Sequence, residues 1–207
     1  MIFDLDGVLV HTDRFHYLAW KALADRMGIV LPDDFADRTR GVSRMASLEL
    51  LLAGSTRAWT GAEKEGLAAE KNEIYISYIQ GMTPDDVSQD EREALEWLRR
   101  KGILLAVGSG SRNAGLILER TGLLSSFDTV VDGNAIRRSK PDPEVFLLAA
   151  ARLGVKPCDT LVVEDAAAGI LAARAGGFTT VAFGGDAASC PLADHTIRRL
   201  TDLTALV

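Results

Sequence analysis

MIFDLDGVLVHTD, residues 1–13, opens the chain with a short apolar stub that runs directly into two aspartates, Asp4 and Asp6. Gly7 follows them and allows the backbone to turn tightly. Two carboxylates at the end of a first strand are explained equally well by a solvated turn and by an active site. The rest of the chain has to decide between these two interpretations.

The second half of the chain alternates short apolar runs with helical segments. We expect strands at 103–107, 129–131, 160–163 and 179–183, and helices at 113–120, from 143 to about 154, and at 166–175. Repeated βα units place helices on both faces of a parallel sheet. The sequence therefore predicts a Rossmann-like, doubly wound α/β core.

Residues 12–80 differ from this pattern, because they contain helical spacing and no strand candidate. Helices are expected at 16–27, 44–52 and 62–79, with glycine and proline between them. The simplest organisation is an α/β core made of residues 1–11 and 81–207. An all-α cap subdomain, residues 12–80, is inserted into it after the first strand.

Composition excludes several classes of protein. The chain has 207 residues and a net charge of −6, which argues against nucleic acid and anionic membrane surfaces as partners. No run of about 18 apolar residues is present, so we expect no membrane span. Two cysteines do not make a disulfide framework, which favours a reducing, cytoplasmic setting. We expect a monomer that binds a small molecule.

Polar motifs recur where the expected strands end. They are Asp4 with Asp6, Ser109 in GSGSRN, Lys140 in RRSKPDP, and Glu164 with Asp165 in EDAAAG. Parallel strands present their carboxyl ends at one edge of the sheet, where ligands of open α/β sheets bind. We therefore expect these four motifs to meet in space.

Together these groups describe a site for phosphoryl transfer. Several carboxylates repel one another unless a cation lies between them, and oxygen ligands of this kind suit Mg²⁺. Ser109 supplies a hydroxyl and Lys140 a positive charge, while the glycine-rich turn exposes backbone N–H groups to an anion. Such a set of groups stabilises a phosphoryl group in transfer.

Each motif taken alone has a plainer explanation. Ser109 is explained as a helix cap, Lys140 as a surface lysine beside a proline, and the Glu164–Asp165 pair as an N-cap. Only the shared sheet edge favours the catalytic interpretation over these alternatives.

The ordered set resembles the haloacid dehalogenase superfamily over nearly the whole chain. The resemblance implies that Asp4 is a nucleophile that forms an aspartyl-phosphate, and that Asp6 is the general acid and base. Ser109 and Lys140 would hold the transferring phosphate. The implied Mg²⁺ ligands are Asp4, the backbone carbonyl of Asp6, Glu164 and Asp165.

The inserted segment, with FHYLAWKALADRMGI and EKNEIYISYI, resembles the cap of the β-phosphoglucomutase-like members of that superfamily. By this resemblance His16 helps to bring the acid/base aspartate into place, Trp20 lines the sugar site and Arg44 grips the second phosphate. The implied substrate-binding residues are His16, Trp20, Arg40, Arg44, Lys71, Asn72, Gly110, Ser111, Arg112 and Asn113.

The implied reaction is the interconversion of β-glucose 1-phosphate and glucose 6-phosphate through β-glucose 1,6-bisphosphate. A Mg²⁺-dependent sugar-phosphate phosphatase on the same fold is the alternative. A phospho-accepting receiver domain also combines acids, Ser/Thr and Lys, but the long helical insert argues against it. Two positions depart from the family pattern: His11 stands where an aspartate is usual, and Ala166 where a serine is.

Overall fold

The computed structural model describes the chain except for residues 40–41, 56 and 185–186. It divides into a core unit, Met1–His11 with Met82–Val207, and a helical unit, Thr12–Gly81. Each unit has an apolar core of its own.

A parallel sheet organises the core unit. Within the described residues its strands are β1 (Ile2–Phe3), β2 (Ala106–Gly108), β3 (Thr129–Val131), β4 (Leu161–Glu164), β5 (Thr179–Phe183) and β6 (His195–Ile197). The strands lie in the order β3-β2-β1-β4-β5-β6, and each neighbouring pair is parallel. The order along the sheet reverses between β1 and β4, which is where ligands bind in such sheets. The predicted doubly wound α/β fold is confirmed.

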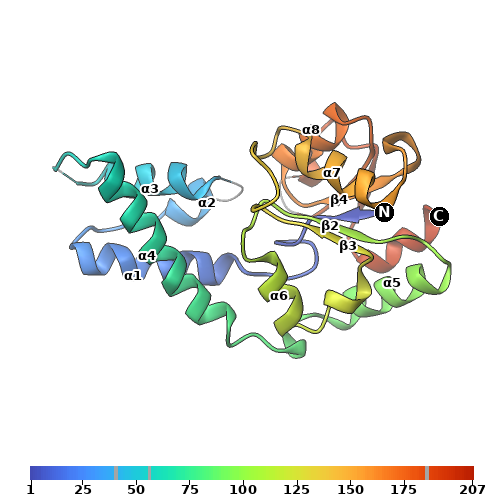
Figure 1. Cartoon of the computed structure of the whole chain (residues 1–207), viewed down its shortest axis with the longest axis horizontal. Helices are drawn as coiled ribbons and strands as arrows, with labels where there is room; N and C mark the ends of the chain where they lie inside the picture. The colour runs from blue at the N-terminus through green and yellow to red at the C-terminus, as the bar shows by residue number, and fades with distance from the viewer. Residues whose placement is uncertain (40–41, 56, 185–186) are drawn as a thin grey trace. The chain divides into compact units, whose positions relative to one another are not determined.

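Helices cover both faces of this sheet. They are α5 (Gln89–Arg100), α6 (Ala114–Arg120), α7 (Glu144–Leu153) and α8 (Ala167–Ala175), with 3₁₀ turns η1 (Pro84–Asp86), η2 (Leu124–Ser126), η3 (Pro157–Asp159), η4 (Ala187–Ser189) and η5 (Leu200–Ala205). Helices α7 and α8 lie on one face, and α5 and α6 lie on the other (Figure 1).

The apolar layer under α7 and α8 holds the sheet edge in place. Phe146 of α7 packs against β2 so closely that a Cβ on Gly108 would lie 2.9 Å from its ring. Only glycine at this position allows α7 to approach β2 to this extent. The residues of this buried cluster are Ile2, Ala106, Val131, Val145, Phe146, Ala149, Ala150, Val162, Ala172, Ala173 and Phe178.

Three expected strand positions need correction. The strand expected at 103–107 is β2 at 106–108, because its ladder with β1 begins at Ala106, and Leu104 is 44% exposed. Strand β4 ends on Glu164, which was expected to follow the strand. Strand β6 was not expected at all, because His195 and Thr196 are exposed and the segment has no apolar run.

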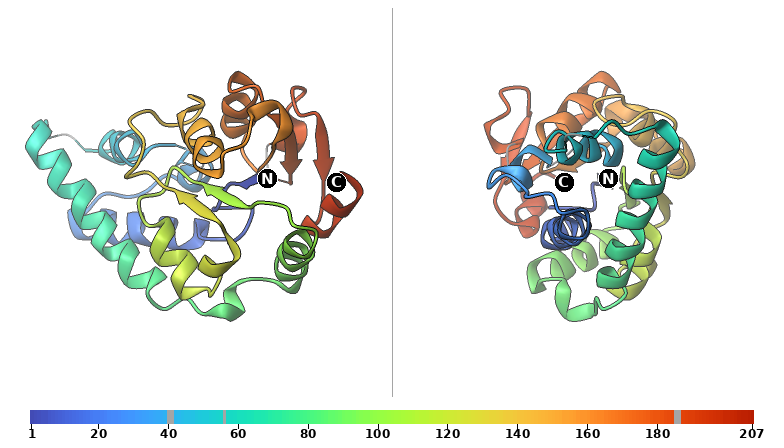
Figure 2. Two further views of the ribbon diagram at one scale, coloured as in Figure 1. Left: turned by 45° about the vertical axis from the view of Figure 1, so that its right-hand side comes forward. Right: turned by 90° about the vertical axis from the view of Figure 1, so that its left-hand side faces the viewer.

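The helical unit consists of α1 (Asp13–Met27), α2 (Phe35–Thr39), α3 (Arg44–Leu52) and α4 (Gly61–Ile79) among its described residues. Gly28 ends α1 in the left-handed conformation (φ 67°), and a capping box between Thr60 and Glu63 begins α4. Helix α4 packs along α1 (Figure 2). The buried side chains of this unit are Trp20, Leu23, Ala24, Phe35, Leu48, Leu51, Leu52, Leu67 and Ala68.

Membrane insertion has no support in the helices that the structure describes: none combines the length and the hydropathy that a span requires.

Candidate active site

Lys140 is the centre of the polar cluster at the carboxyl edge of the sheet. Its Nζ donates to Asp4 Oδ1 at 2.5 Å and also to Glu164 Oε1. The side chains of Lys140, Asp4 and Glu164 are only 14%, 10% and 1% exposed. An ammonium group therefore bridges two carboxylates, one directly after β1 and one at the end of β4.

Electrostatics keep Lys140 charged. Burial by itself would lower the pKa of Lys140, but the carboxylates of Asp4 and Glu164 outweigh it and raise this pKa above the ordinary value. Burial also raises the pKa of Glu164 to about 7, against the attraction of Lys140 and with the repulsion of Asp4 added. Two acids beside one ammonium thus leave negative charge uncompensated in a buried place.

The backbone places these acids side by side. Asp4 follows β1, and its N–H donates to Val163 O of β4 at 2.9 Å. Glu164 Oε2 accepts the N–H of Ala166 at 2.9 Å, which turns its carboxylate toward the start of α8. Gly169 provides the space, since a Cβ there would lie 1.9 Å from Glu164 Oε1.

Three carboxylates at this edge form a set that could hold a metal ion. Asp4, Glu164 and Asp165 each offer an oxygen atom, and these atoms lie within 4.8 Å of one another. When all three carboxylates are ionised, they leave two negative charges against the one ammonium of Lys140, which match a divalent cation. Gly7 makes room for this set, because a Cβ there would lie 2.1 Å from Asp165 Oδ2. All-oxygen donors fit a hard cation such as Mg²⁺.

Ser109 begins a loop that two serine side chains shape. Ser109 Oγ accepts the N–H of Ser111 at 3.0 Å, and Ser111 Oγ accepts the N–H of Asn113 at 3.2 Å. Ser109 is buried. Because Phe3 pairs with Val107, the residues that follow β1 and β2 leave the sheet at the same edge. The hydroxyl oxygen of Ser109 accepts the hydrogen bond from Ser111, and its O–H group can still donate one to an anion.

The loop after β3 fastens this serine loop from the other side. Gly133 N–H donates to Ser111 O at 3.0 Å, and Asn134 Nδ2 donates to Arg112 O at 2.9 Å. A Cβ on Gly133 would lie 2.3 Å from Gly110 O. The backbone carbonyl groups of Ser111 and Arg112 are therefore held toward the loop that follows β3.

The plainer explanations of these motifs are wrong. The N-cap of α6 is Asn113, and the N-cap of α8 is Ala166, so neither Ser109 nor Glu164 caps a helix. Asp4 is only 7% exposed as a whole residue, which excludes a solvated turn at that position. Lys140 is a buried bridge between carboxylates, not a surface lysine.

Asp6 lies half-buried in the turn that leaves β1. Gly7 N–H donates to Val10 O at 2.7 Å, and Leu9 N–H donates to Leu5 O at 2.9 Å, which closes this turn. Gly7 has a φ of 86°, a conformation that other residues rarely adopt. His11 is exposed just beyond this turn.

A second polar cluster lies within the helical unit. Lys71 Nζ of α4 lies 2.8 Å from His16 Nδ1 of α1, and 5.0 Å from the centroid of the Trp20 ring. Lys71 is 2% exposed, although it carries a charge. Burial and the nearby charges of Lys71 and Arg44 lower the pKa of His16 to about 3.

Arg44 and Asn72 extend this cluster at the start of α3. Arg44 Nη2 donates to Asn72 Oδ1 at 2.8 Å. Arg40, expected to bind substrate, lies outside the described residues. The predicted residues of the core unit and those of the helical unit are thus each gathered within their own unit.

Sequence reasoning missed four residues that shape these clusters. Phe146 lies under the Lys140 ammonium, with its ring centroid 4.6 Å from Nζ. Tyr75 stacks on His16, with ring centroids 4.1 Å apart. The other two residues are Gly169 and Asn134. Only Tyr75 carried a signal in the sequence, since it stands one helical turn after Lys71.

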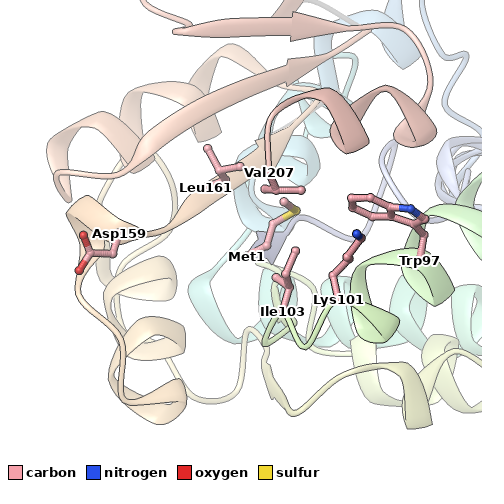
Figure 3. A pocket seen from close by; sticks show the side chains of 7 residues that line it. All are labelled: Met1, Trp97, Lys101, Ile103, Asp159, Leu161 and Val207. Carbon is pink, nitrogen blue, oxygen red and sulfur yellow. The ribbon is translucent and has the colours of Figure 1, made fainter.

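A pocket of the core unit lies elsewhere. It measures about 490 Å³, and Figure 3 shows its lining side chains. They are Met1, Trp97, Lys101, Ile103, Asp159, Leu161 and Val207. Met1 precedes β1 and Leu161 begins β4, so this pocket is at the amino edge of the strands. It contains none of the residues predicted to act in phosphoryl transfer.

Comparisons with known proteins identify the family of the chain. A model of the haloacid dehalogenase-like hydrolases matches residues 1–177. The β-phosphoglucomutase of Bacillus subtilis (strain 168) is 39% identical over 208 residues, which cover 99% of this chain and 91% of that protein. A phosphorylated carbohydrates phosphatase of Thermotoga maritima is 31% identical over 184 residues, or 87% of this chain and 82% of that protein.

A solved structure is similar over almost the whole chain. The crystal structure of the β-phosphoglucomutase from Clostridium difficile has a TM-score of 0.88 to this one, with 33% sequence identity. The match covers 98% of this chain and 91% of that chain.

Proposed function

The chain belongs to the haloacid dehalogenase-like hydrolase family and is an enzyme, and from this premise we propose that it is a β-phosphoglucomutase. It would interconvert β-glucose 1-phosphate and glucose 6-phosphate through a β-glucose 1,6-bisphosphate. The observation that carries the phosphoryl-transfer part of the proposal is the Lys140 ammonium bridging Asp4 and Glu164 at the point where the strand order reverses.

Asp4 is the proposed nucleophile. An oxygen of its carboxylate bonds to the phosphorus of one phosphate, and the bond from phosphorus to the sugar oxygen breaks, which gives an aspartyl-phosphate. Asp6 protonates the departing sugar oxygen, and later removes the proton from the hydroxyl that takes the phosphoryl group back. The β-glucose 1,6-bisphosphate turns end for end after the sugar hydroxyl has taken the phosphoryl group from Asp4, and before its other phosphate passes to Asp4.

Lys140 and the Ser109 loop bind the phosphoryl group. Lys140 stays charged throughout, so it offsets charge on the transferring oxygens. Ser109 donates its hydroxyl proton to the phosphate, and Gly110 and Arg112 offer their N–H groups, because those of Ser111 and Asn113 already donate to serine hydroxyls. Asp4, Glu164 and Asp165 would hold a Mg²⁺ ion. When bound, that ion would supply positive charge that stabilises the transferring group.

A sugar-phosphate phosphatase remains the second candidate, because a phosphatase is among the similar proteins. Its core chemistry would be the same, with water in place of the sugar hydroxyl. What supports the mutase is the helical unit, whose cations Arg44 and Lys71 stand with His16 and Asn72 in one cluster. A bisphosphate substrate needs a second cationic site of this kind.

Parallel assays separate the two candidates. The protein is incubated with β-glucose 1-phosphate, Mg²⁺ and a trace of β-glucose 1,6-bisphosphate, and both glucose 6-phosphate and inorganic phosphate are measured. The mutase predicts glucose 6-phosphate in large excess over released phosphate, and a dependence on the bisphosphate. Phosphate release without glucose 6-phosphate would establish the phosphatase instead.

A further inference from the structure

The environment of His16 determines where its ring proton lies. Lys71 Nζ is 2.8 Å from His16 Nδ1, a hydrogen-bonding distance. A lysine ammonium can only donate, so Nδ1 must accept. A neutral imidazole with Nδ1 as acceptor carries its proton on Nε2.

Tyr75 holds both members of this pair. Its ring stacks on the imidazole of His16 at 4.1 Å between centroids, with an angle of 22° between the planes. The same ring lies 4.7 Å from Lys71 Nζ, which is within the range of a cation–π interaction. Tyr75 is 1% exposed and lies one helical turn from Lys71 on α4. The ring therefore fixes the plane of the imidazole and the position of the ammonium at the same time.

We propose that Tyr75 is a positioning residue, which together with Lys71 fixes His16 as the neutral Nε2–H tautomer. In this form His16 presents a hydrogen-bond donor and carries no proton between groups. Proton transfer in the proposed reaction then falls to Asp6, while His16 acts only by donating a hydrogen bond. This inference rests on the proposed function for its catalytic meaning, but the tautomer itself does not depend on it.

The charges that face His16 support the neutral form. Lys71 on α4 and Arg44 on α3 are both cationic, and protonation of His16 would add a third charge beside them. Burial opposes protonation further. All of these groups belong to the helical unit.

Nuclear magnetic resonance of the full chain, labelled with ¹⁵N at histidine, tests the tautomer directly. The chain has three histidines, and His16→Gln identifies the His16 signals. We expect the chemical shifts of a neutral ring protonated at Nε2, unchanged between pH 5 and pH 8. A ring protonated at Nδ1, or one that titrates near its ordinary pKa of about 6.5, would overturn the proposal.

Variants of Tyr75 test the positioning role. Tyr75→Leu removes the stacked ring, so we expect His16 to populate both tautomers and its pKa to rise toward the ordinary value. Tyr75→Phe keeps the ring and should keep the wild-type signals. Lys71→Met removes the donor to Nδ1 and should also mix the tautomers, without loss of the stacked ring. Wild-type signals in both Tyr75→Leu and Lys71→Met would refute the role.

Tyr78 offers a matched control. It stacks on Phe15, also between α4 and α1, with ring centroids 6.2 Å apart and 10° between the planes. Tyr78→Leu removes an aromatic contact from the same pair of helices without touching His16, and should leave the His16 signals unchanged. If Tyr78→Leu mixed the tautomers as much as Tyr75→Leu, the effect would be general loosening of the helix pair, and the proposal would fail.

Kinetics connect the tautomer with the reaction. For Tyr75→Leu we expect kcat/KM for β-glucose 1-phosphate to fall by on the order of tenfold or more, because the donor is no longer oriented. We also expect a new ionisation on the acid side of its pH profile. If the protein shows the expected tautomer but no mutase activity, the proposed function is wrong and the tautomer assignment holds. If it shows full mutase activity but His16 populates both tautomers, the assignment is wrong and the proposed function holds.

Discussion

Lys140 Nζ lies 2.5 Å from Asp4 Oδ1, although 136 residues separate the two along the chain. The parallel sheet brings them together, since Asp4 follows β1 and Lys140 precedes α7, which packs on β1, β2 and β3. Both side chains are almost completely shielded from solvent, so the charged form of each is stabilised by the opposite charge of the other.

Lys140→Met is therefore expected to damage both stability and activity. It leaves the buried carboxylates of Asp4 and Glu164 beside half-buried Asp165 without a cation, which should lower the free energy of unfolding by about 3–5 kcal/mol in EDTA. Loss of the charge beside the phosphoryl group should lower kcat by on the order of 10²–10³-fold. Denaturant unfolding and steady-state kinetics measure the two effects. The exposed Lys156→Met is the control and should change neither; equal stability of the two variants would contradict the buried bridge.

Asp165→Asn should weaken metal binding. It replaces one of the three carboxylates by a neutral amide, a weaker ligand, and removes a negative charge, so we expect the affinity for Mg²⁺ to fall on the order of tenfold or more. Titration calorimetry with MgCl₂ gives the comparison. Asp159→Asn, at the other edge of the sheet, should bind Mg²⁺ as the wild type does. Unchanged affinity in Asp165→Asn would remove this residue from the ligand set.

Gly169→Ala should disable the site through Glu164. The added Cβ would lie 1.9 Å from Glu164 Oε1, so the carboxylate has to move and its contact with Lys140 is disturbed. We expect a loss of kcat together with lower thermal stability. In Gly115→Ala, on α6, nothing lies within 4 Å of the new Cβ, so stability should rise by about 0.5–1 kcal/mol. The crowding argument fails if both variants gain stability alike.

Asp6→Asn tests the acid/base assignment. The amide cannot exchange a proton, so we expect kcat to fall by on the order of 10²–10⁴-fold while the fold remains intact. Asp33→Asn, an exposed residue of the helical unit, serves as the control for a lost carboxylate. Activity of Asp6→Asn close to that of the wild type would assign proton transfer to another group.

His16 should make stability depend on pH. Its pKa is about 3 in the folded protein, against an ordinary value of about 6.5, so the unfolded chain binds a proton between these values and the folded chain does not. The stabilisation is complete above pH 6.5 and is lost as the pH falls toward 3, by at most about 1.4 kcal/mol per pH unit. Other groups titrate in this range, so the measured quantity is the difference in unfolding free energy between the wild type and His16→Gln. Two parallel curves from pH 7 to pH 4 would show that His16 makes no such contribution.

Local patterns in the sequence were enough for much of the fold. Gly28 and Gly154 mark the ends of α1 and α7, because a left-handed residue is needed there and glycine adopts it without strain. Short runs rich in β-branched residues identify β3 and β5, which is again a local signal. Strand β6 escaped prediction, because an edge strand with one buried residue has no pattern of its own.

The chemical types at the site were also readable. The order of the motifs around Asp4, Ser109, Lys140 and Glu164 predicted one sheet edge, because parallel strands all end on the same side. That prediction needs only topology, which the alternation of strands and helices supplies. The sequence by itself thus determined the kind of fold, the edge that carries the polar groups and the residue types gathered there.

Only the tertiary structure decided which groups touch. That Lys140 bridges two acids, that Gly169 gives Glu164 its place, and that Tyr75 stacks on a histidine 59 positions earlier depend on packing between distant segments. Such contacts leave no periodic signal, because sequence periodicity reports the face of a helix or strand and not its partner. Burial, and with it the shifted pKa values of Lys140, Glu164 and His16, exists only once those partners have come together.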